Sequence, residues 1–288
     1  MSRLTQSIRE IDPSWQAMIE EVENAPTLSR MLIVAWHLSY ALVVELVESE
    51  LTKRARRKTN WENCPRCGGR LESKGFEPRQ IISLLGVIHW RRRVGRCSKR
   101  CRIGQIAPLD QELGLTPNQK TDVRLKQMAC LLAVFVPFGT ASELLQELTG
   151  TQVSSSSIWQ WVQQAGKQMA DWLDQELQAL AKGQSPQMEE ITGEMLRQTL
   201  VIGGDGVMVP FRSQKGTAKG KTVWREVKVG ILARLQQHHN RAGDIIGRLQ
   251  HRRLVAILGD IDAFSERLWL EALRQGIIDS PQVVWLSD

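Results

Sequence analysis

Apolar positions recur with a helical period at the start and in the middle of the chain. Between and after these regions they alternate in short runs typical of strands. This pattern predicts a multi-domain α+β protein. We divide it into N-terminal helices at 1–58, a basic module of strands and turns at 59–112, a helical domain at 113–182, a linker at 183–196 and an α/β domain at 197–288.

The N-terminal segment predicts helices separated by a break at Pro26-Thr27. The most apolar stretch of the chain follows at Met31–Val47, where His37 and Glu45 interrupt it. A membrane-spanning helix needs about 20 predominantly apolar residues, so we expect no membrane span and favour a buried or an oligomerisation helix. The first residues are polar and lack a signal-peptide pattern, which favours the reducing cytoplasm.

Four of the five cysteines form two close pairs. Cys64 and Cys67 have a C-x2-C spacing, 29 residues follow, and Cys97 and Cys101 have a C-x3-C spacing. Thiolates two or three residues apart can share one tetrahedral zinc ion, and four of them leave no open coordination position. The spacing therefore predicts structural zinc, in a zinc ribbon, rather than catalytic zinc. Reduced thiols without metal, or a redox pair at the first spacing, are the alternatives. Cys130 lies in an apolar stretch and is given no role.

The segment between the cysteine pairs predicts a β-hairpin with Gly86 near its bend, which places Cys97 and Cys101 at its far end. Positive charge is concentrated in the same region. The chain has a net charge of +7, but Lys53–Arg102 alone contains 16 Lys or Arg and three acidic residues. This distribution predicts a footprint for DNA phosphates, and a solvated basic face is the alternative. The candidate DNA contacts here are Lys53, Arg54, Arg56, Arg57, Arg91, Arg92, Arg93 and Arg96.

A helix-turn-helix pattern lies in the helical domain. A helix at Thr140–Leu148 ends at Gly150, and a second helix begins after a short turn whose serines can cap it. If the pattern binds DNA, Ser156–Gln164 would enter the major groove. Trp159 and Trp161 are two positions apart and cannot both face the core, so Trp159 is a candidate DNA contact. An ordinary helical hairpin is the alternative.

The α/β domain carries two aspartates at candidate catalytic positions. Asp205 lies between glycines in an apolar strand, and Asp288 ends another apolar strand. The order between them, strand–strand–strand–helix–strand, is the opening of a ribonuclease H-like fold, in which two such carboxylates share divalent metals. Oxygen ligands suit magnesium. Asp260 and Asp262 compete for the second position, although a helix cap explains them more simply. Nearby cations could hold DNA phosphates: Lys219, Lys221 and Arg225.

Several long runs are shared with one known family: CPRCGGRLESKGF, RQIISLLGVIHWRRRVGRC, LLAVFVPFGTASELL, VSSSSIWQWVQQAG, DGVMVPFR, KTVWREVKVGILARL, RRLVAILGDIDAF and RLWLEALRQG. Together they resemble bacterial insertion-sequence transposases of the ISKra type, over roughly residues 60–288. The resemblance implies a protein of the bacterial cytoplasm, associated with the nucleoid, that binds double-stranded DNA at transposon ends.

The resemblance also implies DDE chemistry, in which two Asp and a final Glu of a ribonuclease H-like domain bind magnesium and cut and join DNA. By position, Asp205 is the first Asp and Asp288, in the motif WLSD, is the second. The final Glu and the fifth strand would lie beyond Asp288, so we expect an incomplete catalytic domain and little or no cleavage by this chain alone. The alternatives are a non-catalytic DNA-binding regulator of transposition and a zinc-stabilised scaffold that forms homo-oligomers.

Overall fold

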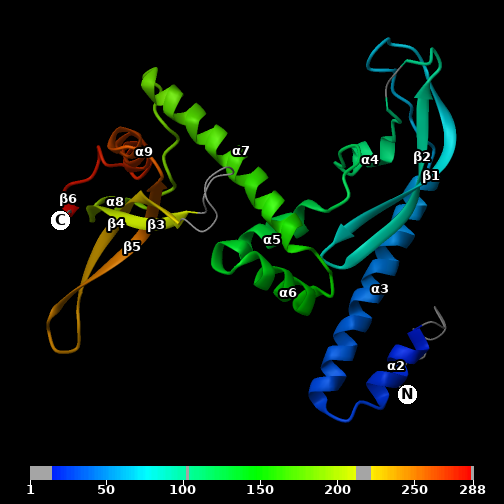
Figure 1. Ribbon diagram of the computed structural model, residues 1–288, viewed down its shortest axis with the longest axis horizontal. Coiled ribbons are helices and arrows are strands. Elements are labelled where there is room, and N and C mark those ends of the chain that lie inside the picture. Colours follow the sequence, from blue (N-terminus) through cyan, green and yellow to red (C-terminus); the bar gives the residue numbers. More distant parts are fainter. Residues whose placement is uncertain (1–14, 102–103, 212–221, 287–288) are drawn as a thin grey trace. The chain divides into compact units, whose positions relative to one another are not determined.

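The computed structural model describes residues 15–101, 104–211 and 222–286. Its backbone is mixed α+β, with helices at the N-terminal end, which confirms the predicted class (Figure 1). The chain divides into two compact units, Met1–Gly166 and Lys167–Asp288, and each is considered by itself. The finer division into five segments remains a prediction.

The first unit begins with two helices, and the break between them lies where the sequence predicts it. Helix α2 spans Gln16–Glu23 and helix α3 spans Leu28–Arg56. The hydroxyl of Thr27 accepts a hydrogen bond from the backbone N–H of Arg30 at 3.2 Å and caps α3. Trp15 and Ile19 pack against partly buried leucines of α3, which ties the two helices together.

Helix α3 is long and apolar enough to cross a membrane by length and composition. The same test is passed by core helices and by signal sequences, and most of this helix is exposed. Over Met31–Val47, where the sequence favours a buried or an oligomerisation helix, most side chains are exposed, although Val34 is buried. Leu38 and Leu42 of this helix pack against α2, and Val47, Leu51 and Ala55 pack in the core of the hairpin.

The predicted hairpin is confirmed. Strand β1 (Leu71–Ser83) pairs antiparallel with strand β2 (Gly86–Cys97), from Leu71 opposite Cys97 to Ser83 opposite Gly86. Gly86 has φ +110°, a conformation that favours glycine, at the bend. Trp90 and two isoleucines of the hairpin form a core with Ala55 of α3 and Leu109 of the short helix α4, Pro108–Glu112. The basic end of α3 and the hairpin are thus packed into one module.

Three helices complete the first unit: α5 (Val123–Phe135), α6 (Phe138–Thr149) and α7 (Ser155–Ala181). Gly150, with φ +69°, ends α6, as predicted. Ser154 accepts a hydrogen bond from the N–H of Ser157 at 3.2 Å and caps α7. Apolar side chains of all three helices share one core, and α7 continues across the division between the units.

The second unit contains the short helix α8 (Gly193–Leu196) and a four-stranded sheet. Its strands are β3 (Thr199–Phe211), β4 (Val223–His239), β5 (Ile245–Ile257) and β6 (Val283–Leu286), and helix α9 (Ile261–Arg274) lies between the last two in sequence. The spatial order is β5-β4-β3-β6, with β3, β4 and β5 antiparallel and β6 parallel to β3. The predicted order of elements is therefore confirmed, and the sheet places β6 directly beside β3.

One face of this sheet packs against α9. Phe264 and Leu268 of α9 join a core with Leu200, Ile202 and Leu232 of the strands. Gly230 lies directly beneath this helix, because a Cβ there would lie 2.8 Å from a methyl carbon of Leu268. Side chains of α9 therefore cover this face of the sheet.

Candidate metal centre and basic surface

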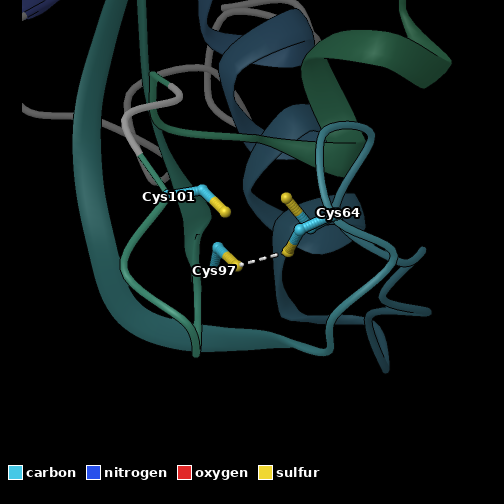
Figure 2. Close-up of side chains that lie close together, drawn as sticks. Cys64, Cys97 and Cys101 are labelled. Atoms are coloured by element: carbon cyan, nitrogen blue, oxygen red, sulfur yellow. Dashed lines mark hydrogen bonds between the residues drawn. The ribbon is translucent and has the colours of Figure 1, made fainter.

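Four thiols meet at one end of the hairpin. Cys64 and Cys67 precede β1, Cys97 is the last residue of β2, and Cys101 follows it. Their sulfur atoms all lie within 4.8 Å of one another (Figure 2). Four sulfurs bound to one zinc at about 2.3 Å would lie about 3.8 Å apart. The Sγ atoms of Cys67 and Cys97 are 3.4 Å apart, which is too long for a disulfide, and all four thiols are free. The cluster could therefore hold a metal ion such as zinc.

Backbone hydrogen bonds shape the first pair of cysteines into a tight knuckle. The N–H of Cys64 donates to the carbonyl of Gly69 at 2.7 Å, and the N–H of Gly68 donates to the carbonyl of Cys64 at 2.9 Å. Gly68 has φ +65°, which allows the chain to reverse within the spacing. Trp61 closes over Gly95, where a Cβ would lie only 2.3 Å from its ring. The turn at Cys64–Gly69 and the packing of Trp61 against Gly95 thus fix the backbone on both sides of the thiols.

The thiols also perturb one another's protonation. The backbone N–H of Cys101 donates to the Cys97 sulfur and, with weaker contributions from the neighbouring thiols, lowers the pKa of Cys97 to about 6. Hydrogen bonding with Cys67 and Cys97 raises the pKa of the Cys101 thiol to about 12. Four thiolates this close repel one another unless a cation lies between them. The donor set and its electrostatics therefore suit a divalent, thiophilic metal.

Most predicted basic contacts surround this module at the surface. Arg91 and Arg96 are exposed on β2, and Lys53, Arg56 and Arg57 are exposed at the end of α3. Arg54 is less available, because its Nε donates to Glu50 at 2.9 Å in an ion pair within the helix.

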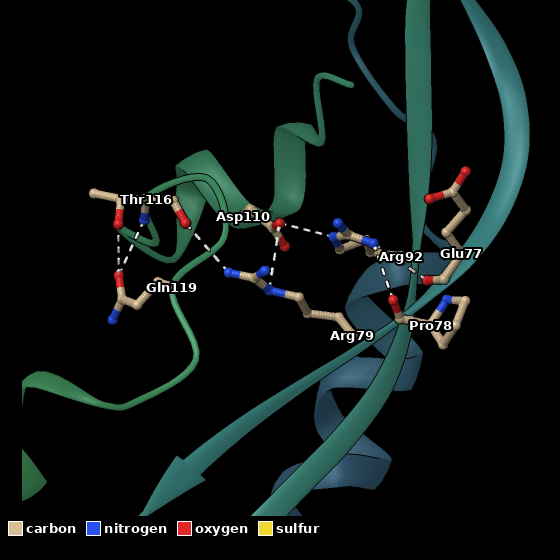
Figure 3. Close-up of polar contacts among 7 residues, drawn as sticks. All are labelled: Glu77, Pro78, Arg79, Arg92, Asp110, Thr116 and Gln119. Atoms are coloured by element: carbon tan, nitrogen blue, oxygen red, sulfur yellow. Dashed lines mark hydrogen bonds and ion pairs between the residues drawn. The ribbon is translucent and has the colours of Figure 1, made fainter. Parts of the chain in front are cut away.

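Arg92 differs from its neighbours, and its placement corrects the expectation that it contacts DNA. Its Nε lies 2.7 Å from the carboxylate of Asp110, and its side chain is 11% exposed (Figure 3). The guanidinium also donates to the carbonyls of Glu77 and Pro78. Arg79 approaches the same carboxylate at 3.8 Å. Arg92 is therefore committed to an internal ion cluster that joins the hairpin to α4.

Arg93 is also less available to DNA, since its guanidinium stacks 4.9 Å from the centre of the Phe76 ring.

In the helical part of the unit, Trp159 is 50% exposed on α7, whereas Trp161 packs against the core. This confirms that the two tryptophans do not face the same way. The outward surface of the first turns of α7 also contains glutamines, which remain available to a partner.

Asp205 lies in the sheet of the second unit, on β3 opposite Val229. Side chains alternate along a strand, so Asp205 lies on the face opposite to Gly204, which faces Phe264 of α9. A hollow of about 550 Å³ beside this residue is lined by Asp205, Gly203, Ile231 and Leu286, among others. The carboxylate accepts a hydrogen bond from the N–H of Gly206 at 2.6 Å. It is exposed and can receive further ligands.

Of the other predicted site residues of this domain, some are described by the structure and some are not. Asp288, Lys219 and Lys221 lie outside the residues that the structure describes. Arg225 is exposed on β4, with its guanidinium 5.8 Å from the centre of the Phe211 ring. Asp260 caps α9 by accepting from the N–H of Ala263 at 2.9 Å, which confirms the simpler explanation for that residue.

A scan of the chain against known protein-family models gives no match, and a search of curated proteins gives none. The geometry of the two sites is therefore the basis for assigning function.

Proposed function

We propose that this chain binds double-stranded DNA through the four-cysteine module and that it is a transposase of the bacterial ISKra type acting on the ends of its element. The carrying observation is that exposed arginines of β2 and of the end of α3 belong to one packed module whose thiols fit zinc. Zinc held between the segment before β1 and the end of β2 would fix the strand that presents Arg91 and Arg96. Cations on a rigid frame bind phosphates without a large ordering cost.

The sheet of the second unit supports the transposase part of the proposal. Three antiparallel strands followed by a fourth that is parallel to the first match the opening of a ribonuclease H-like fold. Gly203 on β3 pairs with Leu286 on β6. Asp205 follows Gly203 by two positions, and Asp288 follows Leu286 by two positions in the sequence. We infer that these carboxylates form a catalytic pair, at which magnesium would activate the attacking oxygen.

Helices α6 and α7 supply a second candidate DNA contact. The glycine-ended helix, short turn and capped second helix agree with a helix-turn-helix, and Trp159 lies on the exposed side of the second helix. Glutamine side chains on the same surface are suited to adenine edges in the major groove. We propose that this surface reads sequence while the cysteine module binds the phosphate backbone.

DNA binding is tested by measuring the affinity of the zinc-loaded chain for a terminal repeat of the element and for a random duplex, across a range of salt. We expect the logarithm of the affinity to fall linearly with the logarithm of salt concentration, because each cation displaces counterions from the duplex. Arg96→Ala should make this dependence shallower by roughly one phosphate contact, whereas the matched exposed Arg248→Ala should leave it unchanged. A flat salt response contradicts phosphate binding, and equal affinity for both duplexes contradicts sequence-specific binding.

A non-catalytic regulator of transposition is the second candidate function. Within the described ranges, only the four cysteines form a group of three or more potential metal ligands, and no such group includes Asp205. If the chain is such a regulator, it should give no magnesium-dependent nicking of element-end DNA. Nicking that is abolished by Asp205→Ala and retained by the exposed Asp244→Ala would contradict this and eliminate the regulator.

The exposed side of α3 supports self-association as a further part of the proposal. Leu32, Trp36, Val43 and Leu46 lie on one exposed side of the helix at coiled-coil spacings. We propose that a second copy of the chain covers this side in the bacterial cytoplasm. A monomeric mass in light scattering at micromolar concentration would eliminate this part.

A further inference from the structure

A cavity of about 850 Å³ lies between the last turns of α3 and the hairpin. All the elements that form it belong to the first unit, and α3 runs beside the hairpin in Figure 1. Its volume is within the range of about 300–1,000 Å³ that is usual for small-ligand sites. Its lining includes Arg56 from α3, Phe76 and Arg79 from β1, and His89, Trp90 and Arg91 from β2.

Aromatic side chains supply the apolar part of this cavity. Trp90 is 5% exposed and packs into the core of the module, so its position at the cavity is fixed. Phe76 is 37% exposed. Its ring is held by the guanidinium of Arg93, and the carbonyl of Phe76 accepts a hydrogen bond from Arg91 at 3.2 Å. An aromatic ring fixed at an open cavity can stack with a planar ligand at little ordering cost.

Cations supply the polar part. Arg56 and Arg91 are exposed, and within the described part of the chain neither forms an ion pair with an acidic side chain. Arg79 contributes its stem, while its guanidinium points towards Asp110 and Thr116 (Figure 3). The residues that line the cavity include no aspartate or glutamate. The cavity therefore has the positive charges of Arg56 and Arg91 beside an aromatic surface, and the carboxylate of Glu48 accepts a hydrogen bond from the backbone N–H of the lining residue His89 at 2.6 Å.

We propose that this cavity receives one unpaired nucleotide of the bound DNA, with its base against Phe76 and its phosphate between Arg56 and Arg91. A base within an intact duplex is stacked on both faces and cannot reach a ring on the protein, so the cavity selects a nucleotide that has left the stack. This inference rests on the proposed DNA binding and specifies the form of DNA that the cysteine module prefers.

The test compares two duplexes of the same sequence, one blunt and one with a single extra unpaired nucleotide, by fluorescence anisotropy. The zinc-loaded full chain should bind the second about tenfold more tightly, because stacking of one base on an aromatic side chain is worth about that factor. Phe76→Ala should reduce this preference to less than about twofold, and Phe76→Tyr should retain it. Arg96→Ala, which changes an arginine that does not line the cavity, should weaken binding to both duplexes equally.

Zinc content and thermal midpoint, measured for each variant, separate loss of the site from loss of the fold. Equal affinity of the wild-type chain for the two duplexes overturns this inference and leaves DNA binding in place. Absence of binding to either duplex overturns the proposed function together with it. An acidic peptide that binds the chain without DNA, and loses affinity in Phe76→Ala, would show instead that the cavity is a protein-binding site.

Discussion

Replacing Cys97 with serine is expected to remove zinc from the chain and to unfold the hairpin module. Cys97 is the last residue of β2 and one of the four clustered cysteines, so its loss leaves three thiols. Three thiols cannot complete the tetrahedral coordination of a structural zinc ion. The free energy of zinc binding to such sites is about 10–16 kcal/mol and contributes directly to folding. We expect metal analysis to fall from about one zinc per chain to nearly none, with a large drop in the thermal midpoint of the first unit.

Cys130→Ser is the matched control, because this fifth cysteine lies on α5, outside the cluster. Cys130→Ser should retain the metal.

Acidification should release the metal, as the Cys97 substitution does. The folded-state pKa of Cys97 is lowered to about 6, so the stability that its thiolate contributes is complete above the ordinary pKa of a thiol and is lost as pH falls through about 6. Bound zinc opposes protonation further, so release should begin below that pH. Full zinc occupancy in Cys97→Ser would contradict the four-thiolate site.

Replacing Asp110 with alanine is expected to destabilise the first unit by about 3–5 kcal/mol, because it leaves two guanidinium groups buried without their carboxylate. Asp110 is 8% exposed, and its partners Arg79 and Arg92 are almost as buried. The ion cluster joins β1 and β2 to α4, so the hairpin should loosen at that point. Denaturant unfolding of the zinc-loaded chain measures the effect.

Glu112→Ala is the matched control for Asp110, since it removes an exposed carboxylate from the same helix. Its effect should lie within about 0.5 kcal/mol. A loss of less than about 1 kcal/mol in Asp110→Ala would show that Arg92 is free to contact DNA, as its position in an arginine run suggests. The two results therefore also test whether Arg92 is held in the ion cluster.

The run Arg91-Arg92-Arg93 shows how far the sequence could predict the basic surface. Net charge identifies the run as a DNA candidate, but a strand directs alternate side chains to opposite faces. Arg92 consequently shares a face with Trp90 and Val94, which are buried, while Arg91 lies on the other. That alternation was present in the sequence. The acid that neutralises Arg92 was not evident, because Asp110 lies 18 positions away and its approach depends on tertiary packing.

Local signals predicted the elements better than their contacts. Gly86 and Gly150 mark a bend and a helix end because both adopt positive φ, and Pro26-Thr27 marks the start of α3 because threonine caps it. The spacing of the cysteines was sufficient to predict a common centre. The register of β6 against β3 was not predictable from local pattern, since parallel partners are set by the intervening helix and its packing.

The central claim is that zinc organises the basic module that binds DNA. The most direct measurement is the affinity of one duplex, at fixed salt, for the zinc-loaded chain, for the chain after chelation, and for the chain after zinc is restored. Chelation should lower the affinity by at least about tenfold and zinc should restore it, with Cys130→Ser behaving as the wild type and Cys97→Ser failing to recover. Unchanged affinity after complete removal of zinc would contradict the claim.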